Sequence, residues 1–186
     1  MSDSDFPQLT TDRLRLEPFE LGHSAGIFRL WSSPEVCLHS RDACDRQGRP
    51  IRLPARSPTD SDKILDFFVR RAQTGTGVRW AVLLARSLTA EDDGCIGAVG
   101  LNALSPVAEL AYHFHPDHWG AGYAEEACAA VLRWCRQDRP GIEIEAFIEA
   151  GNIASARLAR RLGFEPTPES RDGADRYVLR GEADPS

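Results

Sequence analysis

Long apolar segments are absent from this sequence. The longest apolar runs, such as residues 80–85, are far shorter than the roughly 20 residues that a membrane-spanning helix needs. The amino-terminal stretch is acidic and has no apolar core, so it lacks the features of a secretory signal peptide. These absences predict a cytoplasmic protein with no membrane partner.

Disulfide and metal signatures are missing as well. The five cysteines form no Cys-x-x-Cys pair and are odd in number, so they are expected to be free thiols. Three histidines lie close together, at positions 113, 115 and 118, but no carboxylate or thiol at metal-ligand spacing completes a recognised site. The sequence therefore predicts no metal centre.

An excess of positive charge is also absent, since 28 acidic residues face 22 basic ones and the net charge is −6. Nucleic-acid binding depends on cationic side chains that neutralise phosphates, so no nucleic-acid partner is expected. A cationic amine substrate is compatible with this charge. Two nucleotide-binding signatures are missing too. No Gly-Lys-Ser/Thr sequence occurs, and Glu125 stands where a dinucleotide fold requires its third glycine.

The chain has the length of one domain. Its 186 residues are 42% apolar and 27% charged, which is typical of a soluble globular protein with its own core. We expect a single domain over residues 8–180, with flexible termini at residues 1–7 and 181–186. Residues 40–60 contain three prolines and predict a long surface loop.

Hydrophobic periodicity divides this domain into strands and helices. Alternation predicts strands at 13–19, 79–86, 95–104, 107–115, 142–149 and 176–179, and helical spacing predicts helices at 21–31, 59–71, 122–137 and 152–162. The consecutive strands in the middle of the chain should pair in antiparallel fashion, whereas the third of these helices should join two parallel strands by a right-handed crossover. The fold class is therefore α/β (α+β): a mixed, mostly antiparallel central sheet with helices on both faces.

The most informative segment joins a strand to a long helix and reads Pro-Asp-His-Trp-Gly-Ala-Gly-Tyr-Ala-Glu-Glu-Ala over residues 116–127. Gly120 and Gly122 let the backbone come close to a ligand. The helix start adds unpaired N–H groups and the positive end of the helix dipole. Together these features predict an anion site suited to a pyrophosphate, with a plain turn as the alternative.

Three motifs, in this order, carry a family resemblance. Residues 9–16 read Leu-Thr-Thr-Asp-Arg-Leu-Arg-Leu, residues 116–127 hold the two glycines, and residues 152–155 and 162–164 read Asn-Ile-Ala-Ser and Leu-Gly-Phe. On these motifs the chain resembles the GCN5-related N-acetyltransferase (GNAT) superfamily, and within it the RimJ/RimL-like branch of ribosomal-protein alanine N-acetyltransferases. The resemblance covers roughly residues 8–180. It implies an enzyme that moves an acetyl group from acetyl-coenzyme A (acetyl-CoA) onto an amine.

The resemblance assigns cofactor roles around the two glycines. The preceding strand would pair its backbone with the pantetheine arm of the cofactor as an added strand does, through His113, Phe114 and His115. Backbone amides would bind the pyrophosphate at Trp119, Gly120, Ala121, Gly122, Tyr123 and Ala124. Asn152 would reach the pantetheine or a water near the thioester, although Asn also commonly caps a helix N-terminus.

One position departs from the superfamily pattern. Many members carry a tyrosine seven residues after the asparagine, where it protonates the leaving thiolate, and this chain has Ala159 there. Ser155 is the candidate replacement, since helical spacing places it on the same inward face as Leu158 and Ala159. A small residue that bonds only to the backbone would fit the same position.

A base is needed because an alkyl amine is mostly protonated at neutral pH. Glu109 opens the strand before the two glycines, where several superfamily members place a glutamate base, and a carboxylate there could act through a water. Alternation places Glu109 on the face of His113 and His115, so a histidine could relay the proton. The alternative is a solvated edge position for Glu109.

These features together predict direct transfer, in which a primary amine attacks the thioester within a ternary complex and strand amides stabilise the oxyanion. The amine acceptor would be either a protein N-terminus or a small molecule. No pattern indicates which of the two it is, or the oligomeric state. The rival hypothesis is a non-catalytic module that binds acetyl-CoA in a regulatory role, because a fold does not determine a function.

Overall fold

The computed structural model describes residues 6–40, 43–85 and 94–180, so most of the two predicted flexible ends and residue 86 of a predicted strand lie outside it. The strands are β1 (Leu9–Thr10), β2 (Leu14–Pro18), β3 (Ala43–Cys44), β4 (Pro50–Ile51), β5 (Val78–Leu84), β6 (Cys95–Leu104), β7 (Val107–Phe114), β8 (Glu143–Glu149), β9 (Phe164–Arg171) and β10 (Ala174–Leu179). The α-helices are α1 (Ser24–Trp31), α2 (Pro34–Cys37), α3 (Pro58–Gln73), α4 (Tyr123–Asp138) and α5 (Ile153–Arg161), and short 3₁₀ helices span Leu21–His23 and Pro116–His118.

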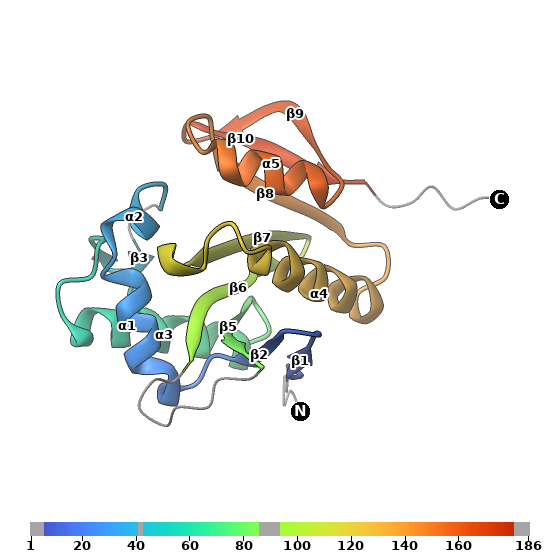
Figure 1. The fold of residues 1–186 in the computed structure, drawn as a ribbon. Coiled ribbons are helices and arrows are strands. Elements are labelled where there is room, and N and C mark those ends of the chain that lie inside the picture. The colour runs from blue at the N-terminus through green and yellow to red at the C-terminus, as the bar shows by residue number, and fades with distance from the viewer. Residues whose placement is uncertain (1–5, 41–42, 86–93, 181–186) are drawn as a thin grey trace.

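One sheet organises the described residues, with the strand order β1-β2-β5-β6-β7-β8-β10-β9. Its neighbouring strands are antiparallel except for β7 and β8, which are parallel and are connected through α4 (Figure 1). This is the mixed, mostly antiparallel sheet that the sequence predicts, with its parallel pair at the predicted crossover. The predicted fold class is confirmed.

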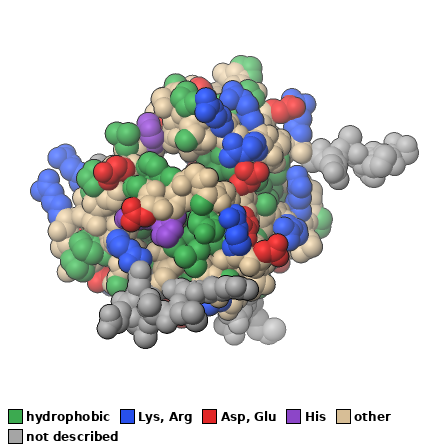
Figure 2. Space-filling view, in the orientation of Figure 1, with side chains coloured by type: hydrophobic (Ala, Val, Ile, Leu, Met, Phe, Trp, Pro, Cys, Tyr) green, Lys and Arg blue, Asp and Glu red, His purple; other side chains and the backbone are tan. Residues whose placement is uncertain are grey.

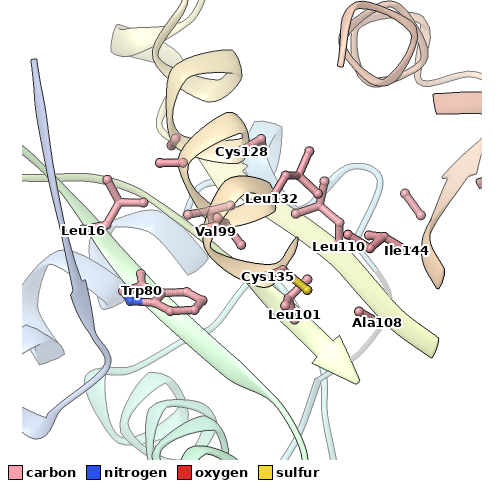
Figure 3. Packing of buried hydrophobic residues seen from close by; sticks show 14 of the residues in the cluster. Leu16, Trp80, Val99, Leu101, Ala108, Leu110, Cys128, Leu132, Cys135 and Ile144 are labelled. Atoms are coloured by element: carbon pink, nitrogen blue, oxygen red, sulfur yellow. The ribbon is translucent and has the colours of Figure 1, made fainter. Parts of the chain in front are cut away.

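Helices cover both faces of the sheet because its central strands are apolar on both sides. On β5, Trp80 and Val82 belong to a cluster under α4 and α5, whereas Ala81 and Leu83 belong to a cluster under α1 and α3. Figure 3 shows the first cluster, in which Cys128, Leu132 and Cys135 of α4 pack on the sheet. Its labelled members are Leu16, Trp80, Val99, Leu101, Ala108, Leu110, Cys128, Leu132, Cys135 and Ile144.

The structure differs from the sequence prediction mainly at the edges of the fold. β9 was not predicted, and its two prolines at positions 166 and 168 argue against a strand. Because β9 is the outermost strand and pairs only with β10, its proline positions are tolerated at an edge. Phe6, expected in a flexible terminus, instead packs edge-on against Trp80 and Trp134.

The predicted loop at residues 40–60 is only partly irregular. Its described part holds the short antiparallel pair β3–β4, with Ala43 opposite Ile51, and the first turn of α3. Ala55 and the partly buried Ile51 and Leu53 contribute to the apolar cluster under α1 and α3. The segment is therefore folded against the domain and forms one wall of the site.

Candidate active site

The parallel pair β7–β8 opens the sheet. Residues 107–109 of β7 pair with residues 143–145 of β8, and beyond them the two strands separate. β8 stays paired with β10 from Ile144 as far as Glu149. A cleft lined by both strands therefore runs along the C-terminal half of β7.

The segment of residues 119–122 follows this end of β7 and leads into α4. Gly120 and Gly122 have φ angles of 74° and 81°, which glycine adopts without a Cβ penalty. Gly122 is the N-cap of α4 and has no side chain to cap the helix. Within the described chain, the N–H groups of residues 120–125 find no hydrogen-bond acceptor. The helix start thus offers free donors and the positive end of its dipole to an anion.

Side-chain contacts hold this segment in place without using its N–H groups. Trp119 Nε1 donates to the Phe114 carbonyl at 2.6 Å, and Arg13 Nη1 donates to the Ala121 carbonyl at 2.9 Å. The Arg13 guanidinium also lies over the Tyr123 ring, 4.6 Å from its centroid. The donors of the helix start are therefore positioned by contacts to carbonyl oxygens and rings and stay available.

Two glutamates in the first turn of α4 would repel an anion if they were unpaired. Glu126 accepts hydrogen bonds from Thr11 Oγ1 and from Arg13 Nε, both at 2.6 Å, and Glu125 accepts from Arg161 Nε at 2.7 Å. Burial alone would raise the pKa of Glu126, but the hydrogen bonds from Thr11 and Arg13 outweigh burial and lower it. Each carboxylate thus has a cationic partner that offsets its repulsion of an anion.

The backbone direction of β7 decides which residues face the cleft. The His115 N–H donates to the Ile96 carbonyl of β6 at 2.9 Å. Since backbone groups alternate in direction along a strand, the N–H of His113 also points toward β6, and those of Tyr112 and Phe114 point toward the cleft. The N–H groups of His113 and His115, for which pantetheine pairing was predicted, lie on the side of β7 that β6 occupies. Phe114 and Tyr112 are the residues with the required orientation.

Asn152 and Ser155 begin α5 and line the cleft from the side opposite β7. Asn152 is the N-cap of the helix, and its Oδ1 accepts from the Ser155 N–H at 3.1 Å. The capping role that was the alternative reading of Asn152 is therefore present, and it leaves the amide NH₂ of Asn152 available.

Tyr112 faces Ser155 across the cleft. Its hydroxyl is buried and has no hydrogen-bond partner among the described residues, although the Ser155 side chain approaches it. Burial raises the pKa of Tyr112, and the nearby Ser155 opposes this shift only in part. Ala159, which stands where the superfamily pattern has a tyrosine, is buried in the same cluster as Tyr112. A protonated phenol thus lies beside the helix face that lacks one.

The cleft leads into a cavity of about 300 Å³ between β7, β8, α3 and α5. Five buried side-chain nitrogen or oxygen atoms of the described residues lack a hydrogen-bond partner, and three of them, in Arg79, Tyr112 and His113, line this cavity. Buried polar groups are nearly always paired in folded proteins, so this concentration indicates a polar ligand. In the space-filling view a hollow separates the part that carries α5 from the helices below it (Figure 2).

Glu109 lies at the closed end of the cavity, where β7 and β8 are still paired. Asn102 Nδ2 donates to Glu109 Oε1 at 3.0 Å, and Arg171 Nη2 donates to Glu109 Oε2 at 2.5 Å. Its side chain is 18% exposed, so the alternative of a solvated edge position does not apply. Both oxygens of the predicted base are thus engaged, each with lone pairs left for a water or an amine.

The two predicted relay histidines lie in different surroundings. His113 lines the cavity, and its Nε2 lies 2.9 Å from Ser40 Oγ. Burial, with the nearby Arg79 charge, lowers the pKa of His113 to about 3, so its ring is neutral and weakly basic. His115 lies outside the cavity lining, and its Nδ1 accepts from the Asp117 N–H at 3.4 Å. Neither arrangement favours a proton relay from Glu109.

Comparison with known proteins identifies the fold family. The sequence model of the acetyltransferase (GNAT) domain matches residues 13–165, which is well over half of the chain. The chain belongs to the acetyltransferase (GNAT) domain family. This membership makes it an N-acetyltransferase, and the RimJ/RimL-like branch that the sequence resembles stays a prediction.

Individual GNAT relatives cover nearly the whole chain. The uncharacterized N-acetyltransferase YoaA of Bacillus subtilis is 28% identical over 167 residues, which is 86% of this chain and 84% of that protein. An acetyltransferase from Agrobacterium tumefaciens superposes with a TM-score of 0.72 at 23% identity, covering 95% of both chains. RimL, a ribosomal L7/L12 alpha-N-protein acetyltransferase solved in complex with coenzyme A, superposes with a TM-score of 0.71 at 18% identity, covering 92% of this chain and 97% of its own.

Several residues of this GNAT site were not predicted from the sequence. Tyr112 lies in a predicted strand, but alternation alone did not show that its hydroxyl lacks a partner. Arg79, Asn102 and Arg171 come from three separate strands, and only the strand order brings them together around Glu109. The one sequence feature that indicated part of this group was an arginine among the apolar residues of β5, because charged side chains are rarely buried unless they are paired.

Metal-ligating clusters and membrane-spanning helices are both absent from the part of the chain that the structure describes. Over the described residues, no group of three or more His, Cys, Asp or Glu side chains is placed to hold a metal ion. The helices in that part of the chain are also too short or too polar to cross a bilayer.

Proposed function

We propose that this GNAT protein transfers the acetyl group of acetyl-CoA directly to a primary amine within a ternary complex. The observation that carries the proposal is the cleft between β7 and β8. Its lining holds unpaired polar groups, and the other end of β7 leads along the chain to the donor-rich start of α4. A pyrophosphate and an acceptor bound at these two ends would meet across β7.

Acetyl-CoA would bind with its pyrophosphate on the N–H groups of residues 120–124, since the N–H of Trp119, also predicted as a donor, bonds to the Pro116 carbonyl at 3.0 Å instead. The RimL neighbour was solved with coenzyme A, and another neighbour, the microcin C7 self-immunity acetyltransferase MccE, with acetyl-CoA. The pantetheine arm would pair with the cleft-facing groups of Tyr112 and Phe114, and the free NH₂ of Asn152 would meet it from α5. The same cleft-facing amides of β7 would stabilise the oxyanion.

The leaving thiolate needs a proton, and Ser155 with Tyr112 would supply it. Both hydroxyls line the cleft, and Tyr112 has no competing acceptor among the described residues. Because burial keeps the phenol protonated, Tyr112 is a donor at every pH at which the enzyme would operate. Ser155, predicted from the sequence as the proton donor, would pass the proton or position the sulfur.

Glu109 remains the candidate base. It lines the acceptor cavity, and a water on one of its free lone pairs would take the ammonium proton. The engagement of Glu109 with Arg171 holds the carboxylate in one orientation. His113 would instead accept a hydrogen bond from the acceptor through its unpaired Nδ1.

Purified protein, acetyl-CoA and a panel of amines and N-terminal peptides test this function through thiol release, corrected for hydrolysis. We expect acetyl-CoA binding by calorimetry and amine-dependent thiol release. Binding without amine-dependent release from any acceptor would favour a non-catalytic module. The cytoplasmic location expected from the sequence stays a prediction, which fractionation of cells would test.

A further inference from the structure

An arginine crosses the sheet beneath the acceptor cavity. Arg79 of β5 is opposite Gly100 of β6, and Gly100 is opposite Ala111 of β7. A Cβ at Gly100 would lie 2.7 Å from Arg79 Cδ, so the side chain of Arg79 occupies the space above this glycine. Small residues at both positions let the arginine reach from β5 to the edge of the cleft.

The guanidinium of Arg79 is buried at the cavity wall. It is 4% exposed, lies under the Phe68 ring at 4.9 Å, and donates to the Ala111 carbonyl at 3.1 Å and to Asn102 Oδ1 at 2.6 Å. Its Nε–H has no acceptor in the described chain. Burial lowers the pKa of Arg79 to about 10, and the group is still charged at neutral pH. A buried charge of this kind is costly unless an anion meets it.

The charges around Arg79 do not balance it. The charge of Glu109 acts to raise the pKa of Arg79, but Glu109 forms its ion pair with Arg171. Arg71, which donates to the Asn102 carbonyl, is a further cation and acts to lower that pKa. The other carboxylate of the lining, Glu149, pairs with His39 at 3.0 Å. Arg79 therefore has no carboxylate of its own among the described residues, although the lining as a whole holds two arginines, Arg79 and Arg171, and two glutamates, Glu109 and Glu149.

We propose that Arg79 binds an anionic group of the acceptor, and that the acceptor is therefore a small primary amine that carries a carboxylate. This inference rests on the proposed acetyl transfer and names the substrate class for it. A guanidinium recognises a carboxylate with parallel hydrogen bonds, and Arg79 keeps an unpaired donor for one. The positive charge of Arg79 also favours the free amine, which is the form that attacks a thioester, over the ammonium.

The shape of the cavity agrees with a small acceptor. Its volume of about 300 Å³ is at the lower end of the range for small-molecule sites. Trp31, Leu53, Ile64 and Phe68 form an apolar wall beside the charged floor. An amino acid with an apolar body fits both surfaces, whereas a protein N-terminus has an amide in place of the carboxylate.

Matched acceptor sets test this inference on the whole protein. Each set holds an amino acid, its decarboxylated amine and its amide: phenylalanine with phenethylamine and phenylalaninamide, and leucine with isoamylamine and leucinamide. We expect kcat/KM for the amino acid to exceed that of both partners by about 10- to 100-fold, the range for a hydrogen bond to a charged group. Equal or better turnover of the amine or the amide in both sets would overturn the inference and leave the proposed function intact.

Substitutions of Arg79 test whether this residue causes the preference for the amino acid over its amine and its amide. Arg79→Met should bring the three members of each set to within about 3-fold of one another, and Arg79→Lys should keep part of the preference. The control is Arg176→Met, since Arg176 pairs with Glu143, Glu145 and Glu169 and lies outside the cavity lining. A full preference in folded Arg79→Met would refute the assignment, and if that variant does not fold, a full preference in Arg79→Lys would refute it. If none of the amines supports thiol release above the rate of hydrolysis, the proposed function is refuted, and this inference with it.

Discussion

A charge placed at Gly120 tests where the pyrophosphate of acetyl-CoA binds. In Gly120→Glu the new Cβ faces open space, with no atom of its surroundings within 4 Å, so the side chain disturbs no packing. A carboxylate about 6 Å from one phosphate charge costs about 3 kcal/mol at an effective dielectric constant of about 20, and solvent exposure roughly halves this value. We therefore expect the affinity for acetyl-CoA to fall about 10- to 100-fold, measured by calorimetry at low ionic strength.

Two controls separate charge from backbone strain. Gly141 also has positive φ, at 81°, and open space around a Cβ, but it lies at the opposite end of α4. Gly120→Glu and Gly141→Glu should therefore lose a similar stability of about 1–2 kcal/mol, seen as a similar shift of the thermal midpoint. Gly120→Gln has the same shape without the charge and should lose less affinity than Gly120→Glu. Equal acetyl-CoA affinities of folded Gly120→Glu and Gly141→Glu would place the pyrophosphate elsewhere.

Three further predictions concern the proton donors, the base and the anchor of the helix start. Ser155→Ala and Tyr112→Phe should each lower kcat at least ~10-fold while acetyl-CoA affinity changes less than about 2-fold, because a proton donor acts only in the transition state. Glu109→Gln should cut kcat/KM at least ~10-fold at neutral pH and less at high pH, where free amine is abundant, and parallel pH–rate profiles of equal height would exclude it as base. The pKa of Glu126 is lowered in the folded state, so its contribution is present at neutral pH and is lost as the pH falls through its titration range. Glu126→Gln should thus lower the free energy of unfolding by about 1 kcal/mol at pH 7, and this effect should shrink progressively as the pH falls below about 4.3, the ordinary pKa of glutamate, measured by urea denaturation.

The amino-acid sequence by itself determined the elements that local patterns encode. Alternation placed β2, β5, β6, β7 and β8 within a few residues of their ends, and helical spacing did the same for α3, α4 and α5. The helix start directly after Gly120 and Gly122 was also predicted from the sequence, because a helix start without a capping side chain is a local feature. Each of these predictions depends on residues close together in the chain, which is why one sequence sufficed for them.

Only the tertiary structure decided which groups meet in the cavity. Arg79, Asn102, Glu109 and Arg171 come from β5, β6, β7 and β9, and their contacts depend on register and strand order that no local pattern encodes. The direction of each N–H on β7 likewise follows from its pairing with β6, which occupies the side of the strand toward which the N–H groups of His113 and His115 point. Burial then set the protonation of His113 and Tyr112, because desolvation depends on everything packed around a group and not on its sequence neighbours.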